Sequence, residues 1–134
     1  MSGHHFTVRV YYEDTDFSGN VYHAAYLKFF ERARTEFLRD LGIHHSELAR
    51  DGIAFAVRRM TIDFAAAAHI DDLLTVVTQV SAFTGARLML RQTILRKETT
   101  LTSAEVTVAA IKVGGGAARM PAELRARLAA DVEG

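Results

Sequence analysis

The 134-residue chain contains no cysteine and carries no net charge. Without a thiol, it has no means to form a disulfide scaffold, a thiolate zinc site or a cysteine nucleophile. Sixteen basic residues balance sixteen acidic ones, which argues against a nucleic-acid-binding protein, because such proteins usually present a basic field. Apolar residues make up 49% of the chain and charged residues 24%. This composition predicts one globular domain over residues 1–134.

The chain also lacks a long apolar run and a secretion signal at its start. Residues 1–5 show neither the basic region nor the apolar stretch of a signal peptide, and no segment reaches membrane-spanning length. We therefore expect a cytoplasmic protein without membrane insertion. Four of the six histidines occur as adjacent pairs, at residues 4–5 and 44–45, and not at the i, i+4 spacing that places two ligands on one helix face. No metal site is predicted.

The hydrophobic period changes within the first third of the chain. Residues 6–12 alternate between apolar and polar, which predicts a half-buried strand. A polar loop follows at residues 13–20, and Asn20 is expected to cap the next helix. Residues 22–41 place apolar side chains at steps of three and four, which predicts an amphipathic helix of about five turns ended by Gly42. The buried face is expected to contain Tyr26, Leu27, Phe29, Phe30, Ala33, Phe37, Leu38 and Leu41.

The remaining sequence is mainly typical of strands. They are predicted at residues 53–64, 73–83, 86–96 and 100–113, with a short helix at 46–50 and a closing helix at 122–131. One strand, a long apolar helix and four strands in a meander predict an α+β fold in which about five antiparallel strands wrap around the helix. Such a curved sheet leaves edge strands exposed, and pairing with a second copy would cover them. We therefore expect a homodimer or homotetramer.

The polar loop before the long helix is the expected place of chemistry. Asp16 lies there, next to a helix N-terminus whose backbone N–H groups are unpaired and partially positive. Such donors polarise a carbonyl oxygen, and a carboxylate acts either as a general base on water or as a nucleophile. A thioester suits this sparse site because its thiolate, from a thiol with a pKa of about 8.5, leaves readily. Asp14 is expected to be a structural turn residue.

Residues 11–34 carry a specific family resemblance. They read YYEDTDFSGNVYHAAYLKFFERAR, and they closely resemble the hotdog-fold thioesterases of the YbgC and 4-hydroxybenzoyl-CoA thioesterase group. The resemblance continues through residues 55–60, 71–74 and 120–124. It implies a hotdog fold, a site at a dimer interface, and hydrolysis of acyl-CoA to a free acid and CoA without a metal or a cofactor.

The resemblance also assigns roles to individual residues. The essential aspartate of the family falls on Asp16, and the tyrosine and histidine of the YbgC branch fall on Tyr12 and His23. Tyr12 is expected to be buried and to support the carboxylate, and His23 to orient the substrate or water. The backbone N–H near His23 matches the position that polarises the thioester carbonyl. The residues expected to contact the substrate are Val21, Tyr22 and Tyr26.

One segment departs from the family pattern. Members of the family often carry a tyrosine, a lysine, a proline and an arginine where residues 64–69 of this chain read FAAAAH. A basic group for CoA phosphate is therefore missing from this segment. The other candidates for phosphate contact, which otherwise form a solvated face, are Arg58, Arg59, Arg87, Arg91, Arg96 and Lys97. Two classes of acyl group fit the sequence equally: short aliphatic groups and hydroxybenzoyl-like aromatic groups.

Other functions compete with hydrolysis. A hotdog dehydratase typically places its aspartate and histidine five residues apart, whereas Asp16 and His23 are seven apart, which favours hydrolysis. A module that binds acyl-CoA or an acyl-carrier protein without cleaving it is a second alternative, and a scaffold for cell-envelope proteins is a third. Independently of these alternatives, Asp16 also fits a loop or capping aspartate, and His23 a packed histidine with one satisfied hydrogen bond.

Overall fold

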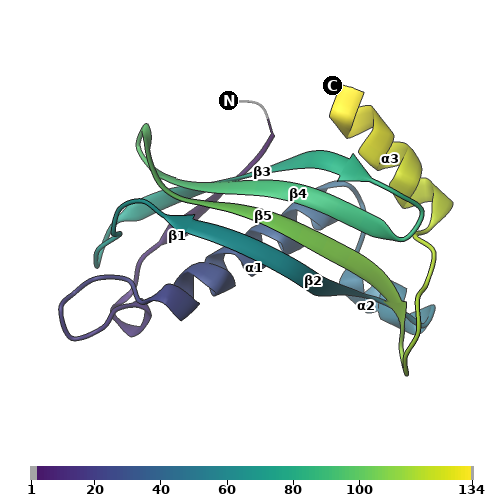
Figure 1. The fold of residues 1–134 in the computed structure, drawn as a ribbon, viewed down its shortest axis with the longest axis horizontal. Helices are drawn as coiled ribbons and strands as arrows, with labels where there is room; N and C mark the ends of the chain where they lie inside the picture. Colours follow the sequence, from purple (N-terminus) through teal and green to yellow (C-terminus); the bar gives the residue numbers. More distant parts are fainter. Residues whose placement is uncertain (1–2, 134) are drawn as a thin grey trace.

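The computed structural model describes residues 3–133, and it shows a curved antiparallel sheet wrapped around a long helix (Figure 1). The ends of the predicted domain, residues 1–2 and 134, lie outside the described residues. The elements are β1 (His4–Arg9), η1 (Tyr12–Asp14), α1 (His23–Asp40), α2 (His45–Arg50), β2 (Ile53–Phe64), β3 (Leu73–Phe83), β4 (Arg87–Arg96), β5 (Thr99–Lys112) and α3 (Ala122–Glu133). The predicted α+β class and the five antiparallel strands around a central helix are confirmed.

The strand order is β1-β3-β4-β5-β2, so the predicted meander of four strands is wrong. Strands β3, β4 and β5 follow one another as hairpins, but β2 lies at the far edge beside β5. A meander would pair β2 with β3, and that side of β3 is occupied by β1. The eight residues 65–72 between β2 and β3 also exceed the usual length of a hairpin loop.

The inner face of the sheet buries one side of α1. Phe29, Phe30 and Ala33 are fully buried, as the periodicity predicts, and the remaining predicted side chains are buried with them except at Leu27 and Leu41. Leu27 is 44% exposed, because it lies about one residue step, or 100°, away from the centre of the apolar stripe.

The end of α1 follows a motif that requires glycine. The N–H of Ile43 donates to the carbonyl of Leu38, and the N–H of Gly42 donates to the carbonyl of Arg39. Gly42 has φ +81°, a left-handed conformation in which a side chain is strained. These are the bonds of a Schellman motif, so Gly42 ends the helix where the sequence predicts.

A bulge in β2 decides which of its side chains face α1. Val57 pairs with Val108 and Met60 pairs with Val106, so β2 advances three residues while β5 advances two. The additional residue is Arg58, and it shifts the inward positions of β2 from odd to even numbers. The bulge therefore allows the aromatic residue at the end of β2 to face α1.

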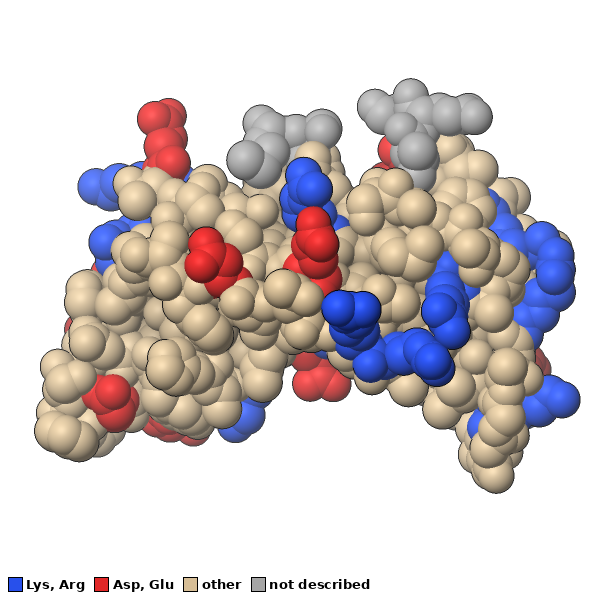
Figure 2. Space-filling model, in the orientation of Figure 1, with Lys and Arg blue, Asp and Glu red and all other residues tan. Residues whose placement is uncertain are grey.

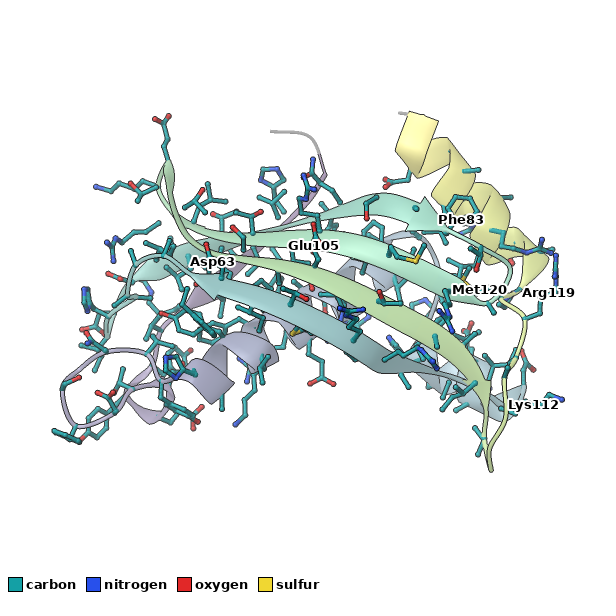
Figure 3. The ribbon with its side chains drawn as sticks, viewed as in Figure 1. Asp63, Phe83, Glu105, Lys112, Arg119 and Met120 are labelled. Atoms are coloured by element: carbon teal, nitrogen blue, oxygen red, sulfur yellow. The ribbon has the colours of Figure 1, made fainter. Side chains whose placement is uncertain are left out.

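The outer face of the sheet is polar, whereas α3 packs against β3 and the end of α1, and its Leu124 and Leu128 join the core around α1. Asp63 and Glu105 lie along β2 and β5 (Figure 3), and Glu105 pairs with Arg91 of β4 at 3.6 Å. Both signs of charge occur on this side of the molecule, with most basic side chains toward the end that carries α3 (Figure 2). Met120 is 2% exposed, and its N–H donates to Gly85 at 2.7 Å, which anchors the start of α3. Within residues 3–133, no helix is long and apolar enough to cross a membrane.

Candidate active site

A cleft of about 410 Å³ opens where the loop before α1 meets the loop after β2. We call residues 13–20 the acidic loop and residues 65–72 the alanine loop. The cleft is lined by Asp16, Asn20, Val21, Tyr22, His23, Tyr26, Phe64, Ala65, Ala66 and Ala67. Five of the six predicted site residues lie in this set, and Tyr12 does not.

Asp14 organises the acidic loop from inside. Its side chain is 7% exposed, and its Oδ2 accepts a hydrogen bond from the N–H of Tyr11 at 2.9 Å. Its carbonyl accepts from the N–H of Tyr22 at 3.2 Å, which joins the loop to the start of α1. The predicted structural role of Asp14 is confirmed.

Asp16 lies at the exposed end of the same loop, where Ser18 holds its carboxylate. Its Oδ1 accepts hydrogen bonds from the N–H of Ser18 at 2.8 Å and from the hydroxyl of Ser18 at 2.5 Å. The Ser18 hydroxyl, followed by the Ser18 N–H, lowers the pKa of the Asp16 carboxyl from its usual value. Asp16 is therefore ionised at neutral pH, as a general base or a nucleophile must be.

Substituting Ser18 by alanine is expected to raise the pKa of Asp16, because a donor to the charged form is lost. The acidic limb of the kcat/KM profile should then move to higher pH, and a carbon-13 titration of the carboxyl should show the same shift. The lowered pKa also stabilises the folded state at neutral pH, and this contribution is lost as the pH falls through the folded-state pKa.

The control for this experiment is Thr15→Val. The Thr15 hydroxyl belongs to the same loop but donates to the carbonyl of Tyr12, so its removal should leave the pKa of Asp16 unchanged. If the pKa of Asp16 is the same in the Ser18→Ala variant as in the wild-type protein, Ser18 does not control the ionisation of Asp16.

The start of α1 presents unpaired donors to the cleft. Tyr22 is the N-cap residue, without a side-chain cap, and His23 is the first helical residue. Within the described part of the chain, the backbone N–H groups of His23 and Ala24 donate to no protein group, as is usual for the first turn of a helix. The expected capping role of Asn20 is wrong, because its Oδ1 bonds to the Nδ1 of His69 at 2.8 Å.

Aromatic side chains form the wall of the cleft nearest the core. Tyr26 is 2% exposed, as predicted for a core residue, and its hydroxyl accepts from the N–H of Ala68 at 3.0 Å. The ring of Phe64 packs on Tyr26 with centroids 5.4 Å apart and on His23 with centroids 4.8 Å apart. This wall gives an acyl group apolar surface next to the donors of α1.

Tyr12 does not occupy the place that the sequence suggests. Strand β1 ends at Arg9, so Tyr12 lies in η1, and its side chain is 80% exposed. The expectation that Tyr12 is buried is therefore wrong. Among residues 3–133 its hydroxyl has no hydrogen-bond partner, and Asp16 is supported by Ser18 instead.

Three contributors to the site were missed from the sequence. Ser18 follows Asp16 by two residues, the spacing at which an aspartate accepts from the backbone in an Asx turn, so a local signal was present. Phe64 and the alanine loop carry no such signal, because tertiary packing places them at the cleft. In the described part of the chain, no group of three or more histidine, aspartate or glutamate side chains is arranged to hold a metal ion.

Comparison with known proteins identifies the family. Residues 10–128 match the thioesterase-like superfamily. The chain belongs to this superfamily. It is 48% identical over 114 residues to the acyl-CoA thioesterase YbgC of Haemophilus influenzae, a match that covers 84% of each chain. It is 46% identical over 105 residues to the acyl-CoA thioester hydrolase YbgC of an Escherichia coli strain, covering 78% of each.

A solved structure agrees with these matches. The crystal structure of a probable thioesterase from Bartonella henselae superposes on this thioesterase-like chain with a TM-score of 0.86 and 48% identity, covering 90% of this chain and all of the other. The predicted family, the hotdog fold and the class of thioester hydrolase are confirmed.

Proposed function

We propose that this protein hydrolyses acyl-CoA to a free acid and CoA at the cleft of Asp16. The observation that carries the proposal is the meeting of an ionised carboxylate, that of Asp16, with the unpaired backbone N–H of His23 in one cleft. The relatives named as acyl-CoA thioesterases, at 46–48% identity, support the substrate class.

The geometry supports a short reaction path. The N–H groups at the start of α1 donate hydrogen bonds to the thioester oxygen and stabilise the negative charge that develops on it. Asp16, as a base, removes a proton from water whose oxygen attacks the carbonyl carbon; alternatively, its carboxylate attacks first and water cleaves the resulting anhydride. In both routes the C–S bond breaks, and the CoA thiolate leaves with its electron pair. His23 is at the cleft to orient the water, and no cofactor is required.

The acyl group is proposed to contact Val21, Tyr22 and Tyr26, all of which line the cleft. Pairing with a second copy would complete the site, because β2 is an edge strand, and Tyr12 and Phe17 are exposed in the single chain. The proposed contribution of Tyr12 to the site requires this second copy. Burial by a partner would also exclude water and strengthen the electrostatic interactions within the cleft.

The direct test is thiol release from acetyl-, butyryl-, benzoyl- and 4-hydroxybenzoyl-CoA by the purified protein. We expect saturable hydrolysis of at least one of these thioesters. The aromatic wall of Tyr26 and Phe64 favours a benzoyl over an acetyl group, because stacking and apolar burial stabilise the larger acyl group. Binding of all four compounds without release of thiol would contradict the proposed activity.

A further inference from the structure

The alanine loop is tied to several parts of the molecule at once. The N–H groups of Ala65 and Ala66 donate to the carbonyl of Leu101 in β5 at 2.9 and 3.0 Å. The carbonyl of Ala68 accepts from Val21 at 2.9 Å, which links the loop to the segment just before α1. The position of this wall of the cleft therefore depends on bonds to the sheet and to the segment just before α1 together.

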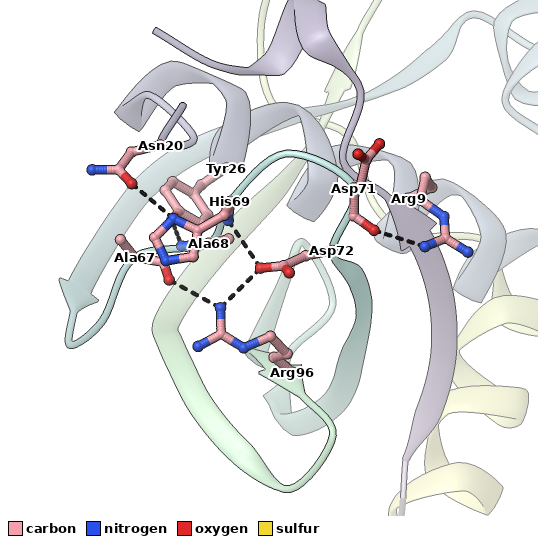
Figure 4. Close-up of polar contacts among 9 residues, drawn as sticks. All are labelled: Arg9, Asn20, Tyr26, Ala67, Ala68, His69, Asp71, Asp72 and Arg96. Carbon is pink, nitrogen blue, oxygen red and sulfur yellow. Dashed lines mark hydrogen bonds and ion pairs between the residues drawn. The ribbon is translucent and has the colours of Figure 1, made fainter. Parts of the chain in front are cut away.

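An arginine from β4 holds the alanine loop from the side (Figure 4). Nη1 of Arg96 donates to Oδ2 of Asp72 at 2.8 Å and to the carbonyl of Ala67 at 3.3 Å. The alanine loop itself contains no lysine or arginine. The guanidinium that neutralises Asp72 is thus supplied by a residue distant in sequence, at the end of the neighbouring strand.

The same carboxylate also fixes the backbone of the alanine loop. Oδ2 of Asp72 accepts from the N–H of His69 at 2.9 Å. Burial raises the pKa of Asp72, but the N–H of His69 and the guanidinium of Arg96 outweigh this effect and lower it below its usual value. Asp72 is therefore a stable anion between two donors at neutral pH.

The contacts continue from His69 to the backbone of Asp16. The imidazole Nδ1 of His69 lies 2.8 Å from Oδ1 of Asn20, so Nδ1 carries the proton of this hydrogen bond (Figure 4). The carbonyl of Asn20 accepts from the N–H of Asp16 at 2.9 Å. A continuous series of contacts therefore joins Arg96, through Asp72, to the residue proposed as catalytic.

We propose that Arg96 is a positioning residue for hydrolysis, which holds the alanine loop and, through His69 and Asn20, the backbone of Asp16. The inference rests on the proposed function. Arg96 does not need to touch the substrate. Its contacts with Asp72 and Ala67 fix one wall of the cleft, and the hydrogen bond between His69 and Asn20 holds the acidic loop against that wall. Small displacements of a reacting group cost up to about a hundredfold in rate.

The test is the Arg96→Gln variant, assayed with butyryl-CoA and benzoyl-CoA. We expect kcat to fall about tenfold, with KM changed by no more than roughly twofold, because the acidic loop is misplaced while the substrate surface stays intact. Arg96→Lys should recover part of kcat, since an ammonium keeps a positive charge near Asp72 but lacks the planar guanidinium that directs the two N–H bonds of Nη1 toward Asp72 and Ala67. Asp72→Asn should also lower kcat, because it weakens the same contact with Arg96.

Arg39→Gln is the control, because Arg39 is exposed near the end of α1, pairs with Glu36 and is not a candidate for phosphate contact. It should leave kcat and KM unchanged. In the Arg96→Gln variant, the NMR resonances of the His69 ring should also move, because the contact with Asn20 loosens.

Two results would overturn the inference. A raised KM with an unchanged kcat would show that Arg96 contacts the CoA phosphates, which its 34% exposed side chain permits. A lowered melting temperature with an unchanged kcat per folded molecule would show a structural role only. Failure of the proposed function is distinguished separately: no acyl-CoA would be hydrolysed even by the wild-type protein.

Discussion

Asp16→Asn is expected to lower kcat by about a thousandfold or more on any acyl-CoA that the wild-type protein hydrolyses. Asparagine keeps the shape of the side chain and still accepts the hydrogen bonds from Ser18, so the loop should fold normally. It has no negative charge, however, and therefore neither removes a proton from water nor attacks the thioester. The measurement is the rate of thiol release at saturating substrate.

Asp63→Asn is the matched control for this substitution. Asp63 is an exposed residue on the outer face of the sheet (Figure 3), and its neighbour Phe64 faces the cleft. The same chemical change there should leave kcat within roughly twofold of the wild-type value. Thiol release by Asp16→Asn at the wild-type rate, with an unchanged circular dichroism spectrum, would exclude Asp16 from the chemistry.

Phe30→Ala is expected to lower the free energy of unfolding by about 3–5 kcal/mol, the usual range for removing a buried phenyl ring from a core. Phe30 is fully buried between α1 and the sheet. Its carbonyl also accepts from the side chain of Gln92 at 3.1 Å, and Gln92 in turn accepts from Arg34 at 2.9 Å. Loss of the ring would therefore leave a cavity beside a buried polar network, which has little freedom to collapse.

Urea denaturation measures this effect, with Lys28→Ala as the control on the same helix. Lys28 is exposed, and its replacement should change the free energy of unfolding by no more than about 0.5 kcal/mol. A loss below about 1 kcal/mol for Phe30→Ala would mean that the core around α1 repacks, and it would contradict the tight enclosure of the helix.

The regular elements could be predicted closely because their signals are local. The limits predicted for β2 and β3 are those observed, and α1 differs from its predicted range by one residue at each end. Apolar periodicity indicates whether a segment is a helix or a strand. Gly42 indicates the end of α1, since only glycine easily adopts the left-handed conformation that the end of this helix requires. The motif around Asp16 also placed the cleft at the start of the buried helix.

The errors arose where neighbouring segments compete. Tyr12 continues the alternation of β1, but the backbone pairing stops after the bonds of Val10 with Asp71 and Asp72, where Asp71 turns with φ +70°, and the chain enters η1. Asn20 has the side chain of a helix cap, but His69 takes its amide oxygen. In both cases a contact from the alanine loop, more than 45 residues away, overrides the local preference.

The sequence alone determined that a carboxylate at Asp16 lies beside a buried amphipathic helix, because both features depend on residues within one continuous segment. Only the tertiary structure decided which distant residues line or support the cleft beside that carboxylate. Phe64 reaches the cleft through the bulge at Arg58, and Arg96 reaches the alanine loop through the pairing of β4 with its neighbours. Strand order and register bring such residues together, and neither is encoded in the periodicity of a single strand.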